Sequence, residues 1–143
     1  QSSVIEAPSH QVFGFVTNME NYKDWFPGII DICSDNDLDH GTVGKKYRER
    51  LLMPNGESEL SITVVESIKN KKFLTQGDLE GVLPQMTIVF TELTPQDCKI
   101  DLQFHSRNQS LNESDELILA LQSDLKTRSH TALATLKRIM EDK

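Results

Sequence analysis

The feature that most restricts the fold is the C-terminal stretch of residues 112–143, which contains neither Pro nor Gly. Asn112 and Ser114 are favoured helix N-cap residues, and Asp115 and Glu116 suit the positive end of a helix dipole. A helix of about 27 residues at about 1.5 Å per residue is roughly 40 Å long. Its apolar side carries Leu117, Leu121, Leu125, Ala132, Leu136 and Ile139. A helix this long can cover a whole β-sheet.

The middle of the chain predicts that sheet, because its apolar residues alternate from Ile29 onward. In the clearest hairpin, residues 45–53 and 57–67 flank Pro54-Asn55-Gly56, and Asn-Gly is the preferred pair of a tight hairpin turn. Residues 72–79, 83–93 and 99–105 also behave as strands. The residues predicted to share the buried face are Leu60, Ile62, Val64, Met86, Ile88, Phe90, Ile100, Leu102 and Phe104.

The N-terminal part predicts one strand followed by two short helices. Residues 1–6 are strand-like and stop at Ala7-Pro8, and apolar residues then recur at helical spacing up to Val16. Residues 19–26 form a second short aromatic turn that ends at Pro27-Gly28. We therefore predict one α+β domain over residues 1–143. It has a helix-grip fold, in which a seven-stranded curved antiparallel sheet carries two short helices after strand 1 and is closed by one long C-terminal helix.

The segment VIEAPSHQVFGFVTNMENYKDWFPGI resembles the opening pattern of the START-like (SRPBCC) superfamily, which includes Bet v 1, the polyketide cyclase/dehydrase group and lipid-transfer domains. A second segment, VGKKYRERLLMPNG, resembles the third strand and hairpin of that superfamily, with Gly44 and Gly56 in place. The likeness covers the full chain and is most specific in the first 30 residues. The matching residues of the opening are Ala7, Pro8, Val12, Phe13, Trp25 and Pro27. The resemblance implies a cavity for a hydrophobic molecule between the sheet and the C-terminal helix.

Composition and motifs exclude several other roles. The net charge of -7 disfavours a polyanionic partner, so we expect no nucleic acid. No apolar run approaches the ~20 residues that span a bilayer, so we expect no stable membrane insertion. The chain opens on Gln1 rather than Met, which is compatible with removal of a leader, and we expect a cytoplasmic domain. The sequence leaves the oligomeric state open.

The sequence also lacks the motifs of metal, cofactor and nucleophile chemistry. Its four histidines are scattered over different predicted elements, and Cys33 and Cys98 stand far apart without zinc-ligand spacing. Nucleophile-elbow, phosphate-loop and dinucleotide-binding patterns are missing from the printed sequence. We therefore predict no metal, no cofactor and no catalytic residue from motifs.

The strand of residues 45–53 is ambiguous because both of its faces carry charge. Tyr47, Glu49 and Leu51 alternate with Arg48 and Arg50, so either set could face the cavity. If Glu49 faces inward, its pKa would be raised, and it could act as a general acid or base or anchor the polar head of a ligand. If the arginines face inward, Glu49 is an ordinary surface residue. Arg128 interrupts the apolar side of the last helix in a similarly ambiguous way.

Three functions follow as hypotheses. The first is non-catalytic binding, or transport, of a small hydrophobic ligand. The second is an enzyme of the cyclase or dehydrase type that would use Tyr47, Glu49 and Arg50, and the third is a protein-interaction module. The predicted ligand-binding residues are Tyr47, Glu49, Leu51, Leu60, Ile62, Val64, Met86, Ile88, Phe90, Ile100, Leu102, Phe104, Leu117, Leu121 and Leu125.

Overall fold

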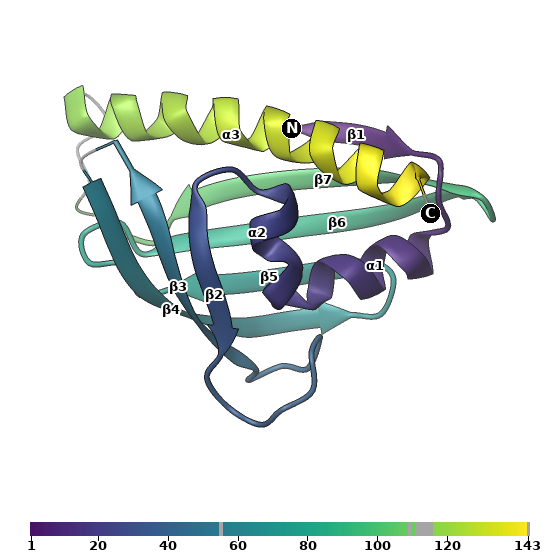
Figure 1. Cartoon of the computed structure of the whole chain (residues 1–143), viewed down its shortest axis with the longest axis horizontal. Coiled ribbons are helices and arrows are strands. Elements are labelled where there is room, and N and C mark those ends of the chain that lie inside the picture. Colours follow the sequence, from purple (N-terminus) through teal and green to yellow (C-terminus); the bar gives the residue numbers. More distant parts are fainter. Residues whose placement is uncertain (55, 109, 111–115, 143) are drawn as a thin grey trace.

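The computed structural model describes residues 1–54, 56–108, 110 and 116–142. It confirms the predicted fold class, with a curved sheet that carries one long helix and two short helical segments (Figure 1). The predicted turn residue Asn55 and the predicted cap residues Asn112 and Ser114 lie outside the described residues. The elements are β1 (Ser2–Ile5), α1 (Ser9–Thr17), η1 (Met19–Asn21), α2 (Tyr22–Trp25), β2 (Ile29–Ser34), β3 (Lys46–Met53), β4 (Gly56–Ile68), β5 (Lys72–Gly77), β6 (Pro84–Thr94), β7 (Asp97–Ser106) and α3 (Glu116–Glu141).

The seven strands form one antiparallel sheet in the order β1-β7-β6-β5-β4-β3-β2. The first two strands of the chain therefore lie at opposite edges, and the segment from α1 to α2 connects them. Strand β1 pairs with β7, with Ser3 opposite Ile100. Helix α3 runs along the sheet near β1 and β7 (Figure 1). Helices α1 and α2 are drawn below α3 in the view of Figure 1.

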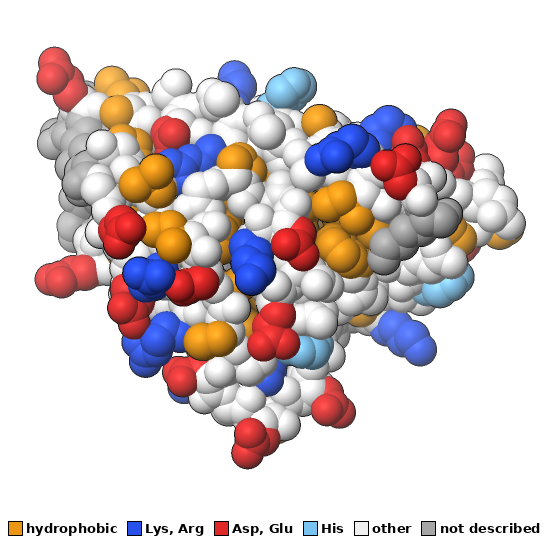
Figure 2. All heavy atoms as spheres, in the orientation of Figure 1, with side chains coloured by type: hydrophobic (Ala, Val, Ile, Leu, Met, Phe, Trp, Pro, Cys, Tyr) orange, Lys and Arg blue, Asp and Glu red, His pale blue; other side chains and the backbone are white. Residues whose placement is uncertain are grey.

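The hairpin of β3 and β4 determines which residues of β3 face the interior. Its register places Met53 opposite Gly56 and Arg50 opposite Glu59. On the outer face, Arg48 pairs with Glu59 at 2.8 Å and Arg50 pairs with Asp31 at 2.6 Å. Figure 2 shows acidic and basic side chains intermixed over the region where β2 and β3 lie in Figure 1. The arginines therefore face solvent, and Tyr47 and Glu49 face inward.

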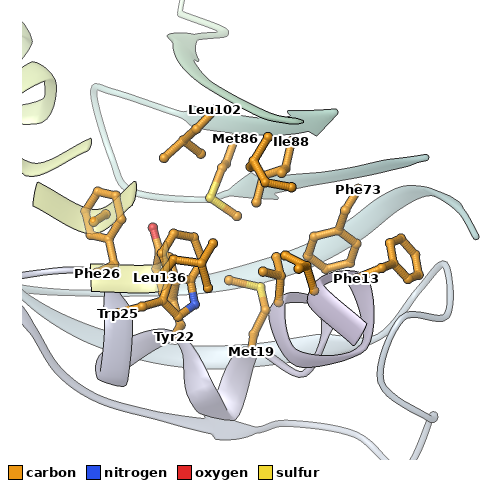
Figure 3. Close-up of a cluster of buried hydrophobic side chains, with 14 of the residues drawn as sticks. Phe13, Met19, Tyr22, Trp25, Phe26, Phe73, Met86, Ile88, Leu102 and Leu136 are labelled. Carbon is orange, nitrogen blue, oxygen red and sulfur yellow. The ribbon is translucent and has the colours of Figure 1, made fainter. Parts of the chain in front are cut away.

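The C-terminal half of α3 packs tightly into the core. Leu133, Leu136 and Met140 are buried, and Figure 3 shows Leu136 among the aromatic side chains of α2. Lys137 Nζ donates a hydrogen bond to the Val4 carbonyl at 3.1 Å, which ties this half to β1. Among the described residues, no helix is both long and apolar enough to cross a membrane.

Candidate ligand-binding cavity

A cavity of about 90 Å³ lies where the first half of α3 passes over the sheet. The short helices contribute Met19 and Tyr22 to its wall, and Figure 3 shows Met86 of β6 pointing toward these two side chains. Most of the wall is apolar. Its residues are Met19, Tyr22, Phe26, Ile29, Glu49, Leu51, Met53, Leu60, Ile62, Thr75, Gly77, Leu79, Val82, Pro84, Met86, Phe104, Leu121, Asp124, Leu125 and Arg128.

The structure brings about half of the predicted ligand-binding residues to this wall. These are Glu49, Leu51, Leu60, Ile62, Met86, Phe104, Leu121 and Leu125. The remaining described ones are buried in the core without lining the cavity, namely Tyr47, Val64, Ile88, Phe90, Ile100 and Leu102. The side chain of Leu117 lies outside the part of the chain that is described. Contact of any of these residues with a ligand stays a prediction.

Glu49 is the buried acid of the cavity. It is 4% exposed and lies on β3 between two other inward-facing residues, Tyr47 and Leu51. No described residue donates a hydrogen bond to its carboxylate or forms an ion pair with it. Burial disfavours the charged form and raises the pKa of Glu49 to about 7. At neutral pH the side chain therefore exists in both forms, so it can donate a hydrogen bond to a molecule in the cavity or accept one.

Arg128 and Asp124 form the second polar group of the wall, on α3. Arg128 Nε lies 2.9 Å from Asp124 Oδ2, and the arginine side chain is only 15% exposed. The guanidinium rests against the backbone of Gly28, which has a φ of 89°. A Cβ at Gly28 would lie 2.1 Å from Arg128 Nη1, so a larger residue at this position would displace the arginine.

The charges of Glu49 and Arg128 act in opposite directions on the hydroxyl group of Tyr22. Burial raises the pKa of Tyr22 well above its usual value, the charge of Glu49 raises it further, and Arg128 opposes the rise. The hydroxyl therefore stays protonated and can donate a hydrogen bond. Tyr22, Glu49 and Arg128 line the same cavity from three different elements, α2, β3 and α3.

Tyr47 faces inward but belongs to a different cluster. Its hydroxyl lies 2.5 Å from His40 Nδ1, and the two rings are stacked. His40 Nε2 in turn lies 3.4 Å from Glu20 Oε1. Burial raises the pKa of Tyr47 to about 12. With Arg50 on the outer face, the structure does not bring Tyr47, Glu49 and Arg50 together, and of the three only Glu49 reaches the cavity.

The polar residues of the wall that the sequence did not point to are Thr75 and Asp124. Arg128 did leave a signal, because it interrupts the apolar side of the last helix. Tyr22 could equally lie at the mouth of a cavity or serve as an ordinary packing residue of a short helix, so the sequence did not decide its role. Among the described residues, no group of three or more His, Cys, Asp or Glu side chains could hold a metal ion.

No protein-family model matches the sequence, and no curated protein matches it by sequence. Solved structures do match the fold. The Zhui aromatase/cyclase from Streptomyces sp. R1128 aligns with a TM-score of 0.79 at 12% identity, over 99% of this chain and 91% of that one. A START superfamily protein from Mycobacterium smegmatis aligns with a TM-score of 0.70 at 11% identity, over 97% of this chain and 96% of that one.

The di-domain aromatase/cyclase BexL, from the BE-7585A biosynthetic pathway, aligns with a TM-score of 0.74 at 14% identity, over 96% of this chain. This chain spans only 44% of the length of BexL and 44% of a second di-domain aromatase/cyclase, StfQ. The matches extend over nearly all the elements of this chain, from β1 to α3. The chain therefore has the helix-grip fold of the START-like superfamily.

Proposed function

We propose that this domain binds one small, largely apolar molecule between the sheet and α3, and that Glu49 holds the polar group of that molecule. The observation that carries the proposal is a carboxylate buried in an apolar wall without a described partner. Burying such a group costs free energy unless it is hydrogen-bonded. A ligand that donates a hydrogen bond to Glu49 would offset that cost.

Trp25 offers a direct readout of binding, because it is the only tryptophan of the chain. Its ring centroid lies 5.3 Å from that of Tyr22 and 6.0 Å from that of Phe26, and both of these residues line the cavity. A molecule entering the cavity should therefore change the fluorescence of Trp25. Native mass spectrometry of gently purified protein would then detect a hydrophobic molecule that is already bound.

The test variant is Ile62→Phe, which fills the cavity from β4, with Val65→Phe on the outer face of the same strand as its control. We expect Ile62→Phe to weaken uptake of the dye 1-anilinonaphthalene-8-sulfonate at least tenfold and Val65→Phe to leave it unchanged. Equal dye uptake by both variants, together with no bound molecule in the mass spectrum, would remove the proposal.

A second candidate function is an enzyme of the cyclase or dehydrase type, supported by the convergence of Glu49, Tyr22 and Arg128 on one cavity. A carboxyl with a pKa of about 7 suits proton transfer at neutral pH. In this role Glu49 would remove a proton beside a carbonyl, while Tyr22 and Arg128 would donate hydrogen bonds to the carbonyl oxygen. The aromatase/cyclase names of structures with the same fold are compatible with this role.

Deuterium exchange into ethyl acetoacetate, followed by NMR, tests this second function. If the domain is an enzyme, the protein should make exchange faster than in buffer. The exchange rate should show an inflection near pH 7 that Glu49→Gln abolishes. Exchange at the buffer rate, in a protein that still takes up the dye, would leave binding alone.

A further inference from the structure

A second hollow lies beside the cavity. It is a groove of about 730 Å³ between β7 and the first half of α3. Its outer part is polar, with Gln103 and His105 on β7 and Gln122 and Lys126 on α3. The cavity, by contrast, is largely apolar away from Glu49, Asp124 and Arg128. The two hollows therefore offer different chemistry to a ligand.

One wall separates the two hollows. Val82, Pro84, Phe104, Leu121 and Leu125 each line both of them. A side chain that borders both spaces separates them by little more than its own thickness. Leu121 and Leu125 are only partly buried, unlike the fully packed Leu136 further along the same helix.

The volume of the cavity shows why this wall matters. At about 90 Å³ it is smaller than the engineered cavity of roughly 150 Å³ that holds benzene in another protein. The wall that β3 and β4 form is less able to yield, because Glu49, Leu60 and Ile62 are buried on strands that are paired with a neighbour on each side. A molecule larger than a few heavy atoms therefore gains space mainly toward the groove.

We propose that the cavity and the groove are one continuous binding site for an elongated amphipathic molecule. Its inner polar end would reach Glu49, and its apolar middle would displace the side chains of Leu121 and Leu125. Its outer end would lie along Gln122 and Lys126. This inference rests on the proposed binding function and extends it, since it specifies the shape and polarity of the ligand.

Straight-chain 1-alkanols from butanol to decanol test the inference, with Trp25 fluorescence as the readout. Each buried methylene contributes enough transfer free energy to raise affinity about fourfold. If the hollows form one site, affinity should keep rising through decanol. An affinity that stops rising at a short chain length would overturn the inference, because the ligand would then end inside the cavity.

The matched variants are Gln122→Phe, which narrows the groove, and Ser123→Phe, an exposed position outside both hollows. We expect Gln122→Phe to weaken decanol binding at least tenfold without changing butanol binding. Ser123→Phe should change neither.

The outcomes separate the two claims. If butanol binds, affinity levels off early and Gln122→Phe has no effect on decanol, the continuous site is wrong and cavity binding stands. If no alcohol of any length binds, the proposed function fails and this inference fails with it.

Discussion

The two halves of α3 carry similar leucines but meet different surroundings. In the second half, Leu133 and Leu136 are almost completely buried against the core. In the first half, Leu121 and Leu125 are partly buried and border the cavity, and Arg128 lies next to them in the same wall. One amphipathic helix thus packs densely at one end and lines a hollow at the other.

This difference shows how stability and a binding site can share one element. Densely packed side chains contribute the full free energy of burial, whereas side chains beside an empty space forgo part of their dispersion contacts. The cavity also contains a buried carboxylate, which costs stability in its charged form. The packed half therefore has to supply the stability that the hollow half lacks.

The largest expected effect is at the packed end. Leu136→Ala should lower the free energy of unfolding by about 2 to 5 kcal/mol, because it creates a new void in dense surroundings. Urea denaturation measures the change. Uptake of 1-anilinonaphthalene-8-sulfonate should stay close to that of the unmutated domain. A loss below about 1 kcal/mol would mean that this half is not densely packed.

The second largest expected effect is the dependence of the free energy of unfolding on pH that Glu49 causes. Its pKa is raised from 4.5 to about 7 in the folded domain, so the folded state holds its proton more tightly than the unfolded state. The proton on Glu49 therefore stabilises the folded state fully below about pH 4.5, and this stabilisation is lost as the pH rises through about 7.

Glu49→Gln removes this dependence. The stability of the variant relative to the unmutated domain should improve by roughly 2 to 3 kcal/mol between pH 5 and pH 8. Urea denaturation of both proteins at the two pH values gives this difference. The contributions of the other titrating groups to stability are the same in both proteins and therefore cancel. A difference that does not change with pH would contradict the burial of the carboxylate.

A smaller effect is expected at the hollow end. Leu121→Ala should cost only about 1 kcal/mol, because Leu121 already borders empty space and little new void is made. Uptake of the dye should rise, since the wall between the cavity and the groove becomes thinner. Matched urea melts and dye titrations with Leu136→Ala make the comparison. Equal stability losses and unchanged dye uptake in both variants would remove the distinction between the two halves.

The smallest effect serves as the reference for α3. Leu119 is 50% exposed and does not line either hollow. Leu119→Ser should change the free energy of unfolding by no more than about 0.5 kcal/mol, as is usual for surface positions. Thermal and urea denaturation check this value. A larger loss would indicate that the first half of α3 makes contacts beyond those described.

Much of the fold could be predicted because local patterns and global architecture agree. The Pro54-Asn55-Gly56 turn and the alternation of Leu60, Ile62 and Val64 indicated the central hairpin and its buried face. The sequence did not decide which face of β3 points inward, because each of the two alternating sets of side chains on this strand contains a charged residue. The turn held a usable signal, since it places Arg50 opposite Glu59, an acid suited to pair with an outward-facing arginine cluster.

The site was predictable only in part because alternation gives the face of a residue but not its position along the strand. Met86 and Ile88 share one face of β6, yet only Met86 reaches the cavity. Part of the wall also comes from Tyr22 and Val82, which lie on a short helix and in a loop. Their meeting with β3 depends on tertiary packing that no local pattern encodes.

The pairing of β1 with β7 has a consequence for how the chain folds during synthesis. Ser3 has to wait for Ile100 before it gains its strand partner, and the two are far apart in the sequence. At ribosomal rates this wait lasts roughly 5 to 20 s. The nascent sheet then has two open edges, which are templates for pairing with other chains. Because α3 follows β7, the helix that completes the core leaves the ribosome only after all seven strands, so a chaperone would have a long opportunity to act before α3 docks.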